Sequence, residues 1–237
     1  MKIGIVDSGL GGLVVLKELL KQQKTAHYIY YGDFKHSPYG NKNDMQLRRY
    51  FQTAMSFFLK KQCDQVLIAC NTLSTIVEPI AENCFTPVFG VKKKMREITS
   101  SKMVVLATKK TIQSHLYEQP NCIGIACPKF VKYLENNPNH DCKKAIHHYL
   151  KKHQDAQTLV LGCTHYQLLK EEIVRYFQHP IKIIDSSEEI ANQLSIKNSS
   201  LQIDLYVTKI NDKIKKNIAI ILQGFTYQIH LLDEPIH

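Results

Sequence analysis

The sequence lacks any apolar run of the roughly 18 residues needed to cross a bilayer, so we expect no membrane-spanning segment. We also expect no secretory leader, because the first apolar stretch is too short for a signal-peptide core and ends at Asp7. The seven cysteines are an odd number, which does not fit a framework of paired disulfides. Together these absences predict a cytoplasmic protein with free thiols.

Acidic residues are few relative to basic ones. Lysine and arginine total 31 against 21 aspartates and glutamates, a net charge of +10, which admits nucleic acid, anionic membranes and anionic small molecules as partners. The basic residues are spread along the chain, and no aromatic platform alternates with them as in nucleic-acid-binding proteins. We therefore expect no nucleic-acid or membrane partner, and a small-molecule substrate whose negative charge suits the basic chain.

Recognisable cofactor motifs are also missing. The turn at residues 7–12 has no glycine at position 14 to complete a dinucleotide fingerprint, and an aspartate at the end of the preceding strand would repel a phosphate. One cluster has metal-ligand residue types but none of the spacings of zinc sites: Cys142, His147, His148 and His153. We expect no nucleotide, pyridoxal or metal cofactor.

Short apolar segments of strand type alternate with longer amphipathic segments along most of the 237 residues. This alternation predicts βαβ units and a mainly parallel sheet, so the expected fold class is α/β. The predicted strands cover residues 3–6, 28–31, 65–69, 87–91 and 103–107, and the predicted helices include residues 13–20 and 45–60.

Two halves of the chain resemble each other. In each half an opening strand ends in a hydroxyl-bearing turn, at Ser8 and at Thr108, and a later strand ends in a small residue followed by cysteine, at Cys70 and at Cys163. The repeat predicts two similar Rossmann-like lobes with the active site in the cleft between them. We expect residues 1–92 plus about 206–237 to form the first lobe and residues from about 93 to 205 the second.

Both cysteines follow predicted parallel strands, and ligands of open α/β sheets bind beyond the carboxyl ends of such strands. If the lobes face each other, the thiols of Cys70 and Cys163 enter one cleft from opposite sides. Inversion of a carbon that carries a hydrogen needs a base on one face and an acid on the other, and two thiols satisfy that symmetry. A free thiol needs an activating neighbour, for which Asp7 and His165 are the candidates. The backbone N–H groups of the turns at 9–12 and 70–72 are expected to bind a carboxylate.

Four ordered motifs together resemble those of the glutamate racemases, within the aspartate/glutamate racemase family. They are Asp7-Ser8-Gly9-Leu10-Gly11-Gly12, Gly32-Asp33 with Pro38-Tyr39-Gly40, Ala69-Cys70-Asn71-Thr72, and Leu161-Gly162-Cys163-Thr164-His165-Tyr166. The resemblance implies an isomerase that interconverts L- and D-glutamate without a cofactor and supplies D-glutamate for peptidoglycan, and hence for cell-wall biogenesis and cell shape. It also implies a homodimer.

The resemblance further implies the role of each residue. Cys70 and Cys163 are expected to be the two proton donors and acceptors, assisted by Asp7 and His165, with Glu135 as a further auxiliary group. The substrate is expected to contact nine residues: Asp7, Ser8, Tyr39, Gly40, Asn71, Thr72, Thr108, Thr164 and His165.

Three other functions stay open: a racemase of aspartate or another amino acid, an amino-acid-binding protein of the same fold without turnover, and a cysteine hydrolase that uses Cys163. The order Thr164-His165 favours glutamate, since aspartate racemases usually have glutamate after the threonine. The chain departs from the family pattern at Leu73, at Gln167 and in the lysines at 92–94, which puts the shape of the pocket and the rate in question.

Overall fold

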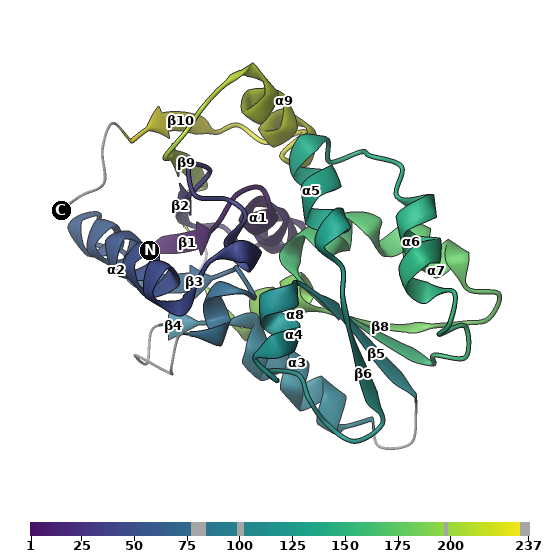
Figure 1. Cartoon of the computed structure of the whole chain (residues 1–237). Helices are drawn as coiled ribbons and strands as arrows, with labels where there is room; N and C mark the ends of the chain where they lie inside the picture. The colour runs from purple at the N-terminus through teal and green to yellow at the C-terminus, as the bar shows by residue number, and fades with distance from the viewer. Residues whose placement is uncertain (77–83, 99–101, 197–198, 233–237) are drawn as a thin grey trace.

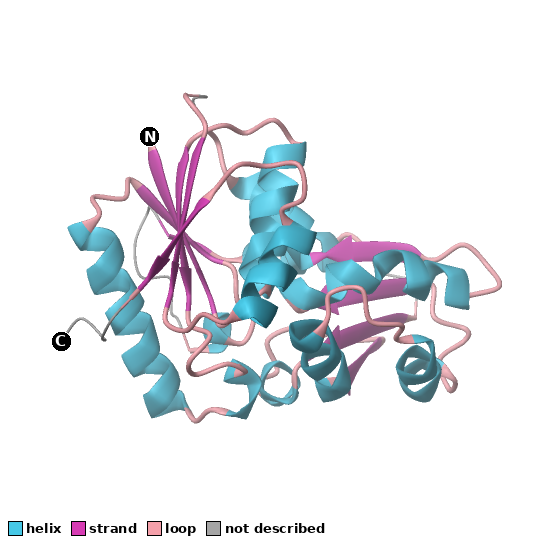
Figure 2. Ribbon diagram, turned by 90° about the horizontal axis from the view of Figure 1, so that it is seen from above, coloured by secondary structure: helices cyan, strands magenta, loops and turns pink. Residues whose placement is uncertain are grey.

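A computed structural model describes residues 1–76, 84–98, 102–196 and 199–232 of the chain. Within these residues the strands form two parallel sheets, one in each of two lobes (Figures 1 and 2). The first sheet has the strand order β10-β9-β2-β1-β3-β4 and the second has the order β6-β5-β7-β8. The predicted α/β fold with two lobes is confirmed.

The first sheet contains β1 (Lys2–Asp7), β2 (His27–Gly32), β3 (Gln65–Ile68), β4 (Cys84–Phe85), β9 (Gln202–Val207) and β10 (Gln228–Leu231). The second contains β5 (Met103–Ala107), β6 (Cys122–Ala126), β7 (Thr158–Gly162) and β8 (Lys182–Asp185). The α-helices are α1 (Gly11–Lys21), α2 (Asp44–Lys60), α3 (Pro87–Arg96), α4 (Lys109–Gln113), α5 (Pro128–Asn136), α6 (Lys143–Leu150), α7 (Lys170–Tyr176), α8 (Ser186–Gln193) and α9 (Asp212–Ile221). Short 3₁₀ helices are η1 (Tyr39–Asn41), η2 (Leu73–Thr75) and η3 (Thr164–Leu169).

The two lobes repeat one strand order. In the first lobe β2, β1, β3 and β4 are neighbours in that order, and in the second lobe β6, β5, β7 and β8 follow the same order. Strand β1 therefore corresponds to β5, and β3 corresponds to β7. The chain returns to the first sheet at Gln202, where β9 pairs in parallel with β2. In Figure 1 this C-terminal segment lies beside the N-terminal strands.

The apolar pattern of the sequence and its helix-capping residues explain where these strands and helices form. Strands β1, β5 and β7 are buried along nearly their whole length, as expected for parallel strands covered on both faces. Helix α1 buries an apolar stripe that includes Leu13, Leu16 and Leu20. Helix α2 begins with a capping box, in which the Asn43 side chain accepts from the Gln46 N–H and the Gln46 side chain accepts in return.

The prediction of a strand at residues 87–91 is wrong, because this segment opens helix α3. Thr86 is extended and Pro87 occupies the first turn of the helix, where its missing N–H costs nothing. Val91 and Met95, four residues apart, are both buried and lie on one side of the helix. The lysines at 92–94 are therefore residues of this helix, and those near its end suit its negative pole.

Helices join the lobes. Helix α8 packs against both α1 and α3, and α1 also contacts η3 of the second lobe. Figure 2 shows the two sheets apart, with helices between them. On the other side α5 contacts α9, where the Asn217 amide donates to the carbonyl oxygen of Glu135 at 3.0 Å. Among the described residues, no helix is both long enough and apolar enough to cross a membrane.

Candidate active site

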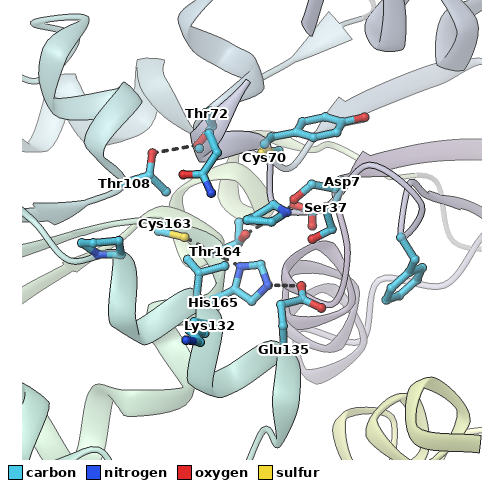
Figure 3. Close-up of a pocket in the computed structure, with 18 of the residues that line it drawn as sticks. Asp7, Ser37, Cys70, Thr72, Thr108, Lys132, Glu135, Cys163, Thr164 and His165 are labelled. Carbon is cyan, nitrogen blue, oxygen red and sulfur yellow. Dashed lines mark hydrogen bonds and ion pairs between the residues drawn. The ribbon is translucent and has the colours of Figure 1, made fainter. Parts of the chain in front are cut away.

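A cavity of about 600 Å³ lies between the lobes, at the carboxyl ends of β1, β3, β5 and β7 (Figure 3). All twelve residues predicted for the site line it: Asp7, Ser8, Tyr39, Gly40, Cys70, Asn71, Thr72, Thr108, Glu135, Cys163, Thr164 and His165. The repeat explains this convergence, since equivalent strands of the two lobes deliver equivalent turns to one space.

Cys70 follows β3 and enters the cavity from the first lobe. Its sulfur accepts a hydrogen bond from the Leu73 N–H at 3.5 Å. Burial raises the pKa of the Cys70 thiol, and negative charge on Asp7 and Cys163 raises it further, against the opposing effect of the Leu73 N–H. Cys70 is therefore held as a neutral thiol.

Cys163 follows β7 and enters the same cavity from the second lobe. Its sulfur lies 3.7 Å from Nδ1 of His165, whose Nε2 lies 2.6 Å from Oε1 of Glu135. The same oxygen accepts a hydrogen bond from the Leu10 N–H of the first lobe at 2.8 Å. Figure 3 shows this row of sulfur, ring and carboxylate on one side of the cavity.

The partners of His165 determine its charge. Burial by itself lowers the pKa of the ring, but the hydrogen bonds to Cys163 and Glu135 together raise that pKa well above its ordinary value. These two hydrogen bonds therefore favour the protonated form of the ring. A cation beside a sulfur atom stabilises negative charge on that sulfur.

Asp7 lies on the floor of the cavity and is fully buried. Its Oδ1 accepts from the Gly9 N–H at 2.9 Å, and the Thr164 hydroxyl lies 3.5 Å from its Oδ2. Burial raises the pKa of Asp7, while the charge of His165 and the Gly9 N–H oppose that shift. Asp7 and the second cysteine turn are thus joined across the lobes.

Two N–H groups of the turn at 9–12, one of the two turns expected to bind a substrate carboxylate, donate within the protein. The Gly9 N–H donates to Asp7 and the Leu10 N–H donates to Glu135. One residue beyond the other predicted turn, at 70–72, the Leu73 N–H donates to the sulfur of Cys70. These N–H groups therefore orient catalytic candidates rather than face the open cavity.

Asn71, predicted to bind substrate, bridges the lobes through both ends of its amide. Its Nδ2 donates to the Ser186 hydroxyl at 3.0 Å, and its Oδ1 accepts from the Tyr117 hydroxyl. Sequence reasoning missed Ser186, although it follows directly after β8, at the strand end where such residues are expected. The bonds fix the residue next to Cys70 against the second lobe.

Thr72 and Thr108 form a second bridge, with 2.9 Å between their hydroxyl oxygens. The Thr108 hydroxyl also lies 3.0 Å from that of Thr111. A Cβ on Gly40 would lie 3.2 Å from Cβ of Thr108, so the loop from the first lobe approaches closely. Tyr39 precedes it and donates to Asp33 at 2.8 Å, which holds the loop in place.

The departures from the family pattern lie outside the cavity lining. Leu73 is fully buried in the core of the first lobe. The Gln167 amide donates to Glu18 of α1 at 3.3 Å and so contributes to the contact between lobes. Lys94 pairs with Glu189 on α8 at 2.5 Å. All three positions thus serve packing between or within the lobes.

Four lysines line the cavity and were not predicted: Lys109, Lys132, Lys209 and Lys213. The cavity-lining residues of α5 fall at positions 128, 131, 132, 135 and 136, the spacing of one helical face. Lys132 lies three residues before Glu135 on this helix, so the helical spacing could have predicted that Lys132 lines the cavity. All seven cysteines are free, and within the described part of the chain no three His, Cys, Asp or Glu side chains form a group that could hold a metal ion.

Comparison with known proteins identifies the family. A family model described as Asp/Glu/Hydantoin racemase matches residues 44–194, more than half of the chain. The chain belongs to the Asp/Glu/Hydantoin racemase family. The glutamate racemase of Aquifex pyrophilus is 33% identical to this family member, with 98% of each chain covered.

Solved structures of the family agree with the two-lobed fold. The glutamate racemase of Francisella tularensis, solved in complex with D-glutamate, superposes with a TM-score of 0.85 at 26% identity, over 98% of this chain and 97% of its own. The glutamate racemase of Campylobacter jejuni has a TM-score of 0.84 at 29% identity, over 95% of this chain and 100% of its own. The similarity thus covers both lobes and the cavity between them.

Proposed function

We propose that this chain is a glutamate racemase, which interconverts L- and D-glutamate by proton transfer at the α-carbon without a cofactor. The observation that carries the proposal is the pair of thiols. Cys70 and Cys163 come from equivalent strands of the two lobes and line one cavity. The full-length similarity to glutamate racemases supports the choice of substrate.

The surroundings of the two sulfurs differ. The ring of His165 lies beside the sulfur of Cys163, whereas burial and the charge of Asp7 raise the pKa of Cys70. Cys163 as thiolate removes the α-proton from one face, and Cys70 as thiol donates its proton to the opposite face. The charge passes from one sulfur to the other, so the reverse reaction starts with the roles exchanged.

The remaining groups bind the substrate and stabilise the intermediate. A carbanion next to a carboxylate is costly, and hydrogen bonds aimed at the developing charge lower that cost. Ser8 lines the same cavity as the two thiols, and its hydroxyl can donate such a bond. Asp7, at the floor, is placed to accept from the substrate ammonium group. Tyr39 and Gly40, on the loop held by Asp33, would contact the substrate from the first lobe.

Racemisation of each enantiomer by the purified chain tests the proposal. We expect L- and D-glutamate to reach the same racemic end point, followed by circular dichroism, with no added cofactor. Racemisation of aspartate but not of glutamate would show that aspartate, not glutamate, is the substrate. Binding of glutamate without loss of optical activity would favour a binding protein, and peptide or ester cleavage would favour the hydrolase.

The cellular setting follows from the same proposal. D-Glutamate is a component of peptidoglycan, so we place the enzyme in the bacterial cytoplasm, where cell-wall precursors are made. Free thiols at all seven cysteines are compatible with that compartment. A homodimer remains the expectation from the family, and sedimentation analysis of the purified chain would test it.

A further inference from the structure

Four of the residues that line the cavity are lysines, two from each lobe. Lys109 on α4 and Lys132 on α5 come from the second lobe, whereas Lys209, after β9, and Lys213, on α9, come from the first. All four side chains are exposed. In Figure 3, Lys132 lies on the same side of the cavity as His165.

The acidic groups of the cavity do not neutralise these lysines. Asp7 is buried on the floor and Glu135 is paired with His165 and the Leu10 N–H. Among the described residues no carboxylate forms an ion pair with any of the four lysines, and Lys213 donates to the amide oxygen of Asn136. The carboxylates of Asp7 and Glu135 thus have partners within the protein. The four lysines have no carboxylate partner among the described residues.

The substrate presents the complementary charge. Glutamate carries two carboxylates and one ammonium group, and Gly9, Leu10 and Leu73 already donate their N–H groups within the protein. Four cationic groups from two lobes supply the positive field that a second carboxylate would find in this cavity.

We propose that these four lysines form an electrostatic collar that captures amino acids with a carboxylate side chain and disfavours those with a neutral amide. The inference rests on the proposed function and adds to it a basis for substrate selection. The collar acts before the chemical step: it raises the concentration of the anionic substrate in the cavity and leaves proton transfer to the thiols.

The physical effect has a known size and a known signature. Charged clefts raise local substrate concentration and capture rates by about 10-fold to 1,000-fold. Salt screens such fields, because the Debye length falls from about 8 Å at 0.15 M to about 3 Å at 1 M ionic strength. A collar effect therefore appears in kcat/KM at low salt and fades at high salt, whereas kcat stays nearly constant.

The test replaces all four collar lysines by glutamine. A control variant carries the same substitution at four exposed lysines outside the cavity: Lys60, Lys144, Lys152 and Lys182. Both variants lose four positive charges from the chain, so they differ only in where the charge is removed.

For the collar variant we expect kcat/KM for glutamate to fall about 10-fold at low salt, with kcat within about twofold of the unmodified enzyme. Its kcat/KM should lose most of its salt dependence, and inhibition by the neutral D-glutamine should not weaken. The control variant should keep both the wild-type kcat/KM and its salt dependence.

Equal losses in the two variants, or an unchanged salt dependence in the collar variant, would overturn the collar. The proposed function is judged separately, by racemisation of glutamate by the unmodified chain. If that chain binds glutamate without racemising it, the same comparison is made on the Kd, and a Kd that is equal in the collar and control variants refutes the collar on its own.

Discussion

Replacing Glu135 by glutamine removes one charge at the centre of the site without changing its shape. Oε1 of Glu135 accepts from His165 Nε2 at 2.6 Å and from the Leu10 N–H at 2.8 Å. The change should lower the pKa of His165 and weaken a contact between the lobes. Both effects are measurable without reference to catalysis.

The size of the stability loss follows from the geometry. Hydrogen bonds to charged groups contribute about 1.5–3 kcal/mol each, and breaking a buried ion pair costs about 3–5 kcal/mol. Because the Glu135 side chain is 20% exposed, we expect the lower part of this range, about 2–3 kcal/mol in the free energy of unfolding. For a chain of this size that corresponds to a fall in Tm of about 5–10 °C.

The loss should depend on pH with a definite sign. The pKa of His165 is higher in the folded chain than in the unfolded chain, so its contribution to stability is complete below about pH 6.5. That contribution disappears as the pH rises through the elevated pKa. The difference in Tm between wild type and Glu135→Gln should therefore be largest near pH 6 and smaller near pH 10.

Thermal unfolding at several pH values measures this difference, and NMR titration of the histidine rings measures the pKa of His165. Glu118→Gln is the matched control, because Glu118 pairs with His115 at 2.7 Å on the surface, where the two side chains are 69% and 72% exposed. Two results would contradict the role given to the ion pair of His165 and Glu135. One is a Tm difference between wild type and Glu135→Gln that does not change with pH, and the other is a His165 pKa that Glu135→Gln leaves unchanged. Since the two enantiomers are equally stable, kcat/KM should fall equally in both directions.

Three further changes test other parts of the site. Cys70→Ser and Cys163→Ser should each reduce kcat by about 1,000-fold or more in a racemisation assay, because either change leaves one face of the α-carbon without its acid or base; near-normal turnover in either would exclude the two-thiol scheme. Gly11→Ala would place a Cβ 2.3 Å from the Thr164 hydroxyl and should cost about 1–3 kcal/mol in urea unfolding, and an unchanged midpoint would show that the lobes are not packed this closely. Tyr117→Phe leaves a buried amide oxygen without its donor and should lower stability by about 1–3 kcal/mol, so a variant as stable as wild type would contradict that bridge.

Much of the fold could be predicted from local pattern. Strands β1, β3, β5 and β7 are short apolar runs, and the turns after them are polar, so both the strands and their repetition are visible in the sequence. The error at α3 has a local cause, since the run from Pro87 is apolar enough for a strand. The proline after Thr86 and the spacing of Val91 and Met95 identify the helix once its burial is known.

The site was predictable as a set of residues but not as a network. The repeat brings Cys70 and Cys163 together, whereas the bond from Asn71 to Ser186 joins positions 115 residues apart and depends on how the lobes dock. The same docking turns the Leu10 N–H toward Glu135 instead of a substrate. Contacts between lobes leave no periodic signal in a single sequence, and they decide which polar groups remain available for a ligand.

Isotope incorporation during the first part of the reaction tests the two-thiol scheme most directly. In deuterated water the product receives its α-hydrogen from the thiol opposite the one that accepted the substrate proton, and thiol protons exchange with solvent. We expect early D-glutamate formed from L-glutamate to carry α-deuterium in full, while the remaining L-glutamate keeps its α-proton. Early D-glutamate that retains the substrate's own proton would contradict the account, because one group would then serve both faces.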